Sequence, residues 1–189
     1  MLEVDFSVFP ELKTERILLR RMTKADTPEI LFLRSSETVM KYIDRERAKT
    51  ITDAESYLDK IDVAMNNNKC IQWGIALLEN PGKIIGYICY WRIVKEHYRA
   101  EVGYMLHPDF WRKGIMKEVL EEVLEYAFTK MKLHSIEANI NPSNNASARL
   151  LESVGFVREA YFREDYYFNG TFHDTIIYSL LEKNLVITQ

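Results

Sequence analysis

The stretch Glu101–Glu118, EVGYMLHPDFWRKGIMKE, predicts a strand, a turn and the start of a long helix in direct succession. Its first six residues are mostly apolar, and Pro108 is expected to end the strand in a turn. Beyond Gly114, apolar residues recur at i, i+3, i+4 and i+7 from Met116 to Met131, with glutamates on the opposite face. This period is typical of an amphipathic helix that packs against a sheet.

Three basic side chains, Arg112, Lys113 and Lys117, gather where this helix begins. A helix N-terminus carries about +0.5 of an elementary charge and several unpaired backbone N–H groups, so cations there are destabilising unless an anion offsets them. Gly114 would let an anion approach the backbone closely. We therefore expect a phosphate or pyrophosphate site at this turn. The alternative is a solvated basic turn that Glu118 partly offsets.

The composition indicates one globular domain and argues against several classes of partner. The chain has 189 residues with 25 basic and 28 acidic side chains, and its net charge of -3 does not favour a nucleic acid partner. No apolar run approaches the roughly 20 residues of a membrane span, and the N-terminus lacks the basic region of a secretion signal. We expect a cytoplasmic protein with no membrane partner.

Common catalytic and metal-binding motifs are missing from the sequence. It contains no GxxxxGK[ST], no GxGxxG after a strand, no HExxH and no GxSxG. The two cysteines, Cys70 and Cys89, lie in apolar, strand-like runs, where a small buried side chain is the favoured interpretation over a redox or ligand role. Hydrolase chemistry and a metal site are therefore not expected.

The remaining pattern predicts an α/β fold, a mixed and mostly antiparallel sheet flanked by helices. Two helices come first, one with Thr23 as N-cap and Asp26 three residues on, the other behind a capping box at Thr52 and Glu55. The other expected elements are strands at 16–20, 70–78, 84–94, 101–106 and 135–140, a helix at 145–154 that ends in a left-handed Gly155, and turns at Pro81–Gly82 and Asn169–Gly170.

Residues 111–116, WRKGIM, resemble the acetyl-CoA signature of the GCN5-related N-acetyltransferases (GNAT), (Q/R)-x-x-G-x-(G/A). Trp in the first position is common in the branch of the ribosomal-protein alanine and serine acetyltransferases. The chain is identified as a member of this family, as one domain over 1–189 with its core at about 10–183. Further matching pieces follow in family order: TERILLR at 14–20, EVGY at 101–104, NNAS at 144–147, VGF at 154–156, Asp174, and YSLL at 178–181.

The resemblance implies a fold in which the strands at 101–106 and 135–140 splay apart and receive the pantetheine arm of acetyl-CoA, the cosubstrate. The arm would pair with the backbone near Met105 and Leu106. Asn144 and Ser147 match family positions that contact this arm or its sulfur. The pyrophosphate would be held at Arg112, Lys113, Gly114, Ile115, Met116 and Lys117.

The family's chemistry is direct attack of a neutral primary amine on the thioester, without a covalent enzyme intermediate. A lysine-like amine has a pKa of about 10.4, so a base must take its proton. Glu101 is the best-placed carboxylate for that role, and the alternative is an exposed strand residue paired with Arg99 or Lys95. The acceptor is expected to be a protein N-terminus or a small-molecule amine.

Capping of the helix that begins at about Asn145 is the local alternative to these cofactor contacts, and Ser143, Asn144 or Ser147 could each provide it; both roles can hold together. Many relatives place a Tyr four residues before the Gly-Phe pair as the acid that protonates the leaving thiolate. Leu151 stands there in this chain, which leaves Ser147 or water as the candidate proton donor.

Met116 departs from the signature, which has Gly or Ala at this position. Its side chain either crowds the pyrophosphate turn or begins the apolar stripe of the helix and faces the core. Together with the missing Tyr, this departure keeps a non-catalytic acyl-CoA-binding or sensor domain as the alternative function.

The segment 161–172, YFREDYYFNGTF, is unusually aromatic. Packing under a hairpin is the favoured interpretation, and the alternatives are that it lines an acceptor pocket or forms the surface of a homodimer. The resemblance implies that residues 40–47, MKYIDRER, form another wall of the acceptor site.

Overall fold

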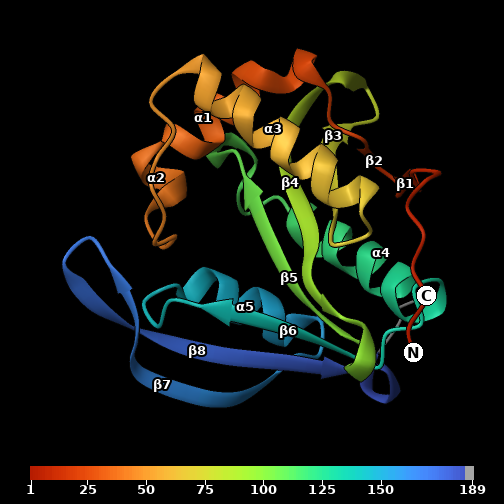
Figure 1. The fold of residues 1–189 in the computed structure, drawn as a ribbon, viewed down its shortest axis with the longest axis vertical. Helices are drawn as coiled ribbons and strands as arrows, with labels where there is room; N and C mark the ends of the chain where they lie inside the picture. The colour runs from red at the N-terminus through yellow and green to blue at the C-terminus, as the bar shows by residue number, and fades with distance from the viewer. Residues whose placement is uncertain (186–189) are drawn as a thin grey trace.

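The computed structural model describes residues 1–185 and arranges eight strands in one sheet of order β1-β2-β3-β4-β5-β6-β8-β7 (Figure 1). Neighbouring strands are antiparallel except β5 and β6, which are parallel, and this confirms the predicted mixed sheet. The strands are β1 Leu12–Lys13, β2 Ile17–Arg20, β3 Ile71–Leu77, β4 Asn80–Val94, β5 Arg99–Leu106, β6 Ser135–Ile140, β7 Val157–Phe168 and β8 Thr171–Leu181. The helices are α1 Thr27–Ser35, α2 Glu37–Met40, α3 Ile51–Asn66, α4 Ile115–Thr129 and α5 Asn145–Ser153.

Helices cover the two faces of the sheet and bury two separate cores. On one face, α1 and α3 bury Ile30 and Leu58 in a cluster that includes Met105 of β5. On the other face, α4 and α5 bury a larger cluster that includes Val123 and, from β5, Leu106. Successive side chains of a strand point to opposite faces, so Met105 and Leu106 mark the two sides of the sheet where β5 ends. No helix within the described residues has the length and apolar character needed to cross a bilayer.

The parallel strands β5 and β6 pair over only three residues, from Arg99 opposite Ser135 to Glu101 opposite Glu137. Beyond this point β5 stays paired with β4, and β6 stays paired with β8. Figure 1 shows the two strands diverging, β5 toward α1 and α2 and β6 along β8. We call the two edges left unpaired, 102–106 of β5 and 138–140 of β6, the sheet split. The predicted splaying of these strands is therefore confirmed.

The predicted turn at Pro81–Gly82 is wrong, because Leu78 and Glu79 connect β3 to β4. Pro81 and Gly82 instead lie at the start of β4, where the pairing register with β3 shifts. Proline has no N–H to donate to a ladder and is tolerated at such a bulge. The carbonyls of Pro81 and Gly82 accept hydrogen bonds from the Arg20 guanidinium, at 2.8 and 3.3 Å. The irregular backbone thus anchors β4 to β2.

The capping box of α3 lies at Thr50 and Asp53 rather than at the predicted Thr52 and Glu55. Asp53 accepts hydrogen bonds from the backbone N–H groups of Lys49 and Thr50, at 2.8 and 2.9 Å, and Thr50 Oγ1 accepts from Asp53 N at 3.2 Å. Thr50–Asp53 and Thr52–Glu55 both have the three-residue spacing of a capping box. The extended backbone of Thr50, with φ of -134°, decides where the helix begins.

The other local signals are confirmed. Thr23 and Asp26 form a capping box, in which Asp26 Oδ2 accepts from Thr23 N at 2.8 Å. Gly155 follows α5 with a left-handed φ of 94°, and Asn169 and Gly170 form the β7–β8 turn with φ of 49° and 83°. Two left-handed residues in succession are typical of the tight hairpin turn that the sequence predicts.

Candidate active site

The turn between β5 and α4 brings the predicted anion-binding residues together. Arg112 and Gly114 both adopt left-handed backbone conformations, with φ of 59° and 75°, and Gly114 is the N-cap of α4. The first intrahelical hydrogen bond runs from Glu118 N to Gly114 O at 3.1 Å. The N–H groups of Ile115, Met116 and Lys117 therefore have no acceptor within the helix, which is the arrangement that binds an anion.

Arg16, the residue before β2, contacts this turn through its guanidinium. Its Nη1 donates to Lys113 O at 3.2 Å, and its Nε donates to Glu118 Oε2 at 2.7 Å. Thr14 Oγ1 and the Arg16 backbone N–H donate to the other carboxylate oxygen of Glu118. Burial alone would raise the pKa of Glu118, but these hydrogen bonds outweigh it and lower the pKa. Sequence reasoning quoted Thr14 and Arg16 only as part of the family match and did not assign them to the site.

The partners of Glu118 are thus Thr14 and Arg16, which precede β2, rather than the basic side chains of the turn. Lys117 has another partner, Glu121, at 3.7 Å, one helical turn further on. The Lys113 ammonium lies 5.4 Å from the ring centroid of Phe110. The alternative interpretation, a basic turn partly offset by Glu118, is therefore corrected: the partners of that carboxylate are Arg16 and Thr14.

The position of the Met116 side chain decides between the two alternatives for this residue. Its side chain is 8% exposed and belongs to the core cluster under α4, as does that of Ile115. Only the backbone N–H groups of these two residues face the turn, so the larger side chain does not crowd it.

We expect Arg16→Met to weaken the binding of CoA about tenfold, because charge-assisted hydrogen bonds of about 1.5–3 kcal/mol fix the turn that carries the free N–H groups. Calorimetric titration with CoA measures the change in Kd. Arg21→Met is the matched control, because Arg21 follows the same strand but pairs with Asp62 at 2.9 Å, away from the turn. Equal affinities for the two variants would contradict this role of Arg16.

The backbone of β5 presents alternate residues to the sheet split. His107 N donates to Ile85 O at 2.8 Å, which makes this a hydrogen-bonded pair of the β4–β5 ladder. Such pairs alternate along antiparallel strands, so Met105 bonds to Tyr87 of β4, whereas the backbone groups of Tyr104 and Leu106 point toward β6. The Leu106 carbonyl accepts from Trp111 Nε1 at 2.8 Å. Of the two predicted backbone positions, Leu106 therefore faces the split, and Met105 packs its side chain against α1 and α3.

Glu101 lies at the base of the split and is 6% exposed. Its Oε2 accepts from Arg92 Nη1 at 3.0 Å. The expected partners Arg99 and Lys95 are wrong, because Arg99 lies 3.7 Å from Glu137 and a bulge in β4 brings Arg92 over Glu101 instead. Burial raises the pKa of Glu101, the Arg92 charge opposes this, and the neighbouring Glu137 carboxylate raises the pKa further.

Two buried side-chain oxygens within the described residues have no hydrogen-bond partner, Tyr104 Oη and Asn139 Oδ1. Both belong to the strands that separate, Tyr104 to β5 and Asn139 to β6, and both lie beyond the last β5–β6 pair. Asn139 Nδ2 donates to Glu137 Oε1 at 3.0 Å, on the Glu101 side of the sheet. Tyr104 packs on the opposite side, against the α4–α5 core. Tyr104 enters the sequence analysis only as the last residue of the matching piece EVGY, and Asn139 does not enter it, so neither residue is predicted as part of the site.

Asn144 and Ser147 meet at the start of α5. Asn144 is the N-cap, and its Oδ1 accepts from Ser147 N at 3.2 Å, so the capping interpretation holds for Asn144. The Ser147 hydroxyl lies beside Tyr104 Oη, and burial raises the pKa of Tyr104 to about 12 while Ser147 opposes that rise. Leu151 is fully buried in the core.

The β7–β8 hairpin contacts the segment that follows α2. Tyr166 Oη donates to Asp44 O at 2.8 Å, and the Arg45 guanidinium lies 4.7 Å from the Trp91 ring. The aromatic side chains of the hairpin do not pack under it, because Tyr167 is 61% exposed and Phe172 is 59% exposed. The favoured sequence interpretation of this segment is therefore wrong.

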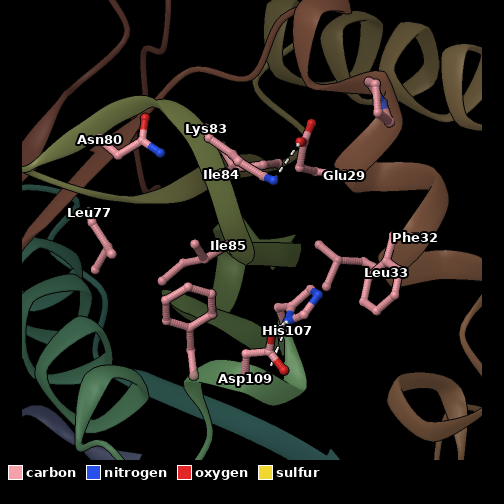
Figure 2. A pocket seen from close by; sticks show the side chains of 12 residues that line it. Glu29, Phe32, Leu33, Leu77, Asn80, Lys83, Ile84, Ile85, His107 and Asp109 are labelled. Atoms are coloured by element: carbon pink, nitrogen blue, oxygen red, sulfur yellow. Dashed lines mark hydrogen bonds and ion pairs between the residues drawn. The ribbon is translucent and has the colours of Figure 1, made fainter.

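A cavity of about 460 Å³ lies between α1, the β3–β4 turn and the start of the β5–α4 turn. Figure 2 shows the ring of Phe32 beside that of His107, and the two rings stack with their centroids 4.3 Å apart. An ion pair between Lys83 and Glu29 lies at the opposite end of the cavity. None of the predicted catalytic or cofactor residues lines this cavity. No cluster of three or more metal-ligating side chains occurs within the described residues.

Comparison with known families gives one match over most of the chain. Residues 16–157 match the model of the acetyltransferase (GNAT) domain. The uncharacterized N-acetyltransferase YoaA of Bacillus subtilis is 34% identical over 93% of this chain and 98% of its own length.

Solved structures agree with this match. The crystal structure of a GNAT-family acetyltransferase from Bacillus anthracis has a TM-score of 0.81 and 30% identity, and it covers 92% of this chain and 99% of its own. Spermidine N-acetyltransferase from Vibrio cholerae, solved with CoA and spermine, has a TM-score of 0.79 and 23% identity over 90% of this chain and 98% of its own. Ribosomal-protein serine and alanine acetyltransferases are also among the structural neighbours, as the sequence resemblance implies.

Proposed function

Because the chain belongs to the GNAT family and is an N-acetyltransferase, we propose that acetyl-CoA binds at the sheet split and gives its acetyl group directly to a primary amine. The whole chain would act as one domain. The observation that carries the proposal is the coincidence, at one end of β5, of an unpaired strand edge and three unpaired helix N–H groups.

The unpaired edges of the split provide hydrogen-bond partners for an extended amide chain. The pantetheine arm carries two amides and would add to β5 as a short strand, pairing with the backbone at Leu106. The diphosphate would then lie at the N–H groups of residues 115–117, where the helix dipole and the side chains of Arg112 and Lys113 stabilise its charge. Asn144, at the start of α5, would contact the arm from the β6 side of the split.

The chemistry requires an amine without its proton. Glu101 lies on the α1–α3 side of the split, and its raised pKa brings this carboxylate closer to the pH at which a base works best. Glu101, directly or through a water molecule, would take the proton as nitrogen attacks the thioester carbon. A backbone N–H at the split would stabilise the negative charge that develops on the carbonyl oxygen.

The acceptor side of the split is rich in groups that suit a cationic amine. Glu101, Glu137 and the unpaired Asn139 Oδ1 lie on this side, and the Asp44 carboxylate lies 3.8 Å from His173 at its rim. Both spermidine and a protein N-terminus carry such an amine. The sensor alternative receives no support from Met116, because its side chain packs in the core.

The test is calorimetry with acetyl-CoA, followed by thiol release over a panel of spermidine and peptides that begin with Ala or Ser. We expect binding that weakens with salt, because a basic turn holds the diphosphate, and turnover with one class of amine. Binding of acetyl-CoA without turnover of any amine would favour the sensor domain. Absence of binding would contradict the proposed site.

A further inference from the structure

Strand β4 departs from regular geometry directly beside Glu101. Trp91 pairs with Glu101 in the β4–β5 ladder, and the register of the ladder shifts between Trp91 and Val94. Arg92, within this bulge, adopts a left-handed backbone conformation with φ of 48°, which is uncommon for a residue with a side chain. Strained backbone of this kind persists only where the surrounding structure holds it, and both bulges and strain concentrate near functional sites.

The bulge turns the Arg92 side chain toward Glu101. In a regular strand, Arg92 would point to the face opposite Trp91, because successive side chains alternate. Its guanidinium instead lies 4.5 Å from the centroid of the Trp91 ring, and its Nη1 donates to Glu101 Oε2 at 3.0 Å. The Arg45 guanidinium packs on the same ring at 4.7 Å. One aromatic side chain therefore supports two cations that both act on the buried carboxylate.

The groups that act electrostatically on Glu101 come from three parts of the fold. Arg92 and Cys89 belong to β4, Arg45 follows α2, and Glu137 is the paired residue of β6. The Cys89 thiol is neutral, because burial raises its pKa to about 12. The two guanidinium groups favour the ionised form of Glu101, whereas burial and the Glu137 carboxylate favour the neutral form. Arg92 makes the larger of the two favourable contributions.

We propose that Arg92 is a positioning residue of the reaction, which keeps the buried Glu101 carboxylate ionised and oriented to accept the proton of the amine. The inference rests on the proposed function, in which Glu101 is the base. Without Arg92, burial and Glu137 would be opposed chiefly by Arg45, and more of the Glu101 population would already carry a proton when the amine arrives. Arg92 acts only through Glu101 and exchanges no proton itself.

The test measures the pH profile of kcat/KM for Arg92→Met and Arg92→Lys. We expect Arg92→Met to lower kcat/KM about tenfold on the acidic limb, which equals a displacement of that limb by about one pH unit, and to leave the plateau at higher pH unchanged. Arg92→Lys keeps the charge and should keep the acidic limb close to that of the unchanged enzyme. A merely structural role would lower the rate at every pH instead.

Two further variants separate the charge of Arg92 from its backbone conformation and from surface charge in general. Arg92→Gly removes the same charge as Arg92→Met but suits the left-handed backbone, so it should displace the limb equally and have a Tm at least as high. Arg158→Met is the matched control, because the Arg158 guanidinium also lies over an aromatic ring, 5.5 Å from that of Tyr161, but on the edge strand β7. It should leave the pH profile unchanged.

Carbon NMR of the glutamate carboxyl groups tests the ion pair without any turnover. The Glu101 resonance is the one that Glu101→Gln lacks, and its pKa should be higher in Arg92→Met than in the unchanged protein. An unchanged pKa in Arg92→Met would overturn the inference, and so would an acidic limb that Arg92→Met and Arg92→Lys displace equally. Absence of acetyl-CoA binding in calorimetry would contradict the proposed function instead, and the NMR titration does not depend on that binding.

Discussion

Glu101→Gln is expected to lower kcat by about 100-fold or more, because general base catalysis contributes roughly 10²- to 10⁴-fold. Glutamine keeps the shape of the buried side chain and can still contact Arg92, but it cannot take a proton from the amine. Thiol release at saturating acetyl-CoA measures the loss. Glu122→Gln makes the same chemical change on α4, away from the split, and should leave kcat unchanged.

The pH dependence of the unchanged enzyme should report the same group. A base works only when it is ionised, so kcat/KM should fall as the pH drops through the pKa of Glu101, which burial raises above 4.5. Glu101→Gln should lack this acidic limb. A variant that keeps both the rate and the acidic limb would remove Glu101 from the role of base.

A rise in pH should affect the stability of the folded protein in the opposite direction to its activity. Because the folded-state pKa of Glu101 is raised, the folded protein binds this proton more tightly than the unfolded chain does. Between the two pKa values, the free energy of unfolding therefore decreases as the pH rises, and the charged form remains destabilising at pH 7. Glu101→Gln should thus be at least as stable as the unchanged protein at pH 7, although it is less active.

Gly86→Ala is the second substitution with a large expected effect, because a Cβ at Gly86 would lie 2.4 Å from Met105 O. Backbone atoms cannot move aside as the end of a flexible side chain can, so β4 and β5 must shift apart. Overpacking of this kind costs about 1–3 kcal/mol, which corresponds to a decrease in Tm of roughly 2–12 °C. The shift occurs next to Leu106, so the affinity for CoA should also fall by about tenfold or more.

Gly103→Ala is the matched control on the same pair of strands. A Cβ at Gly103 would meet its nearest neighbours, Cys89 Sγ and Trp91 Nε1, at 3.5 and 3.6 Å, which are ordinary contact distances. We expect Gly103→Ala to keep both the Tm and the Kd for CoA. Thermal unfolding and calorimetry measure the two quantities. Similar losses in both variants would indicate that any added side chain on these two strands, rather than the clash with Met105 O, is responsible.

The sequence carries most of the fold because its signals are local. The apolar period of α4, the hairpin turn at Asn169–Gly170 and the left-handed Gly155 each depend on neighbouring residues. The α3 cap was misplaced because Thr50 and Thr52 have equivalent spacing to an acidic residue. The β3–β4 turn was misplaced because Pro81 and Gly82 also suit a bulge. In both cases the tertiary structure decides between two local solutions.

The site also combines residues that the sequence predicts with contacts that only the tertiary structure reveals. Arg112, Gly114 and Lys117 are close in the sequence, so their clustering could be predicted. The contact of Arg16 with Lys113 joins segments 97 residues apart, and the partner of Glu101 depends on a bulge in β4. No local pattern encodes these contacts. The unpaired Tyr104 hydroxyl is also a property of the packed structure alone.

The three-residue contact between β5 and β6 also bears on how the protein unfolds. The strands β1–β5 form one antiparallel block and β6–β8 form another, and within the sheet only this short parallel ladder joins them. Helix α4 contacts β1 and β2 from the first block and α5 from the second, so it is the main brace between them. Two blocks joined this narrowly can exchange amide hydrogens as separate units. A ligand bound between the two blocks would add hydrogen bonds where β5 and β6 do not pair. The two blocks would then unfold as one cooperative unit only with the substrate bound.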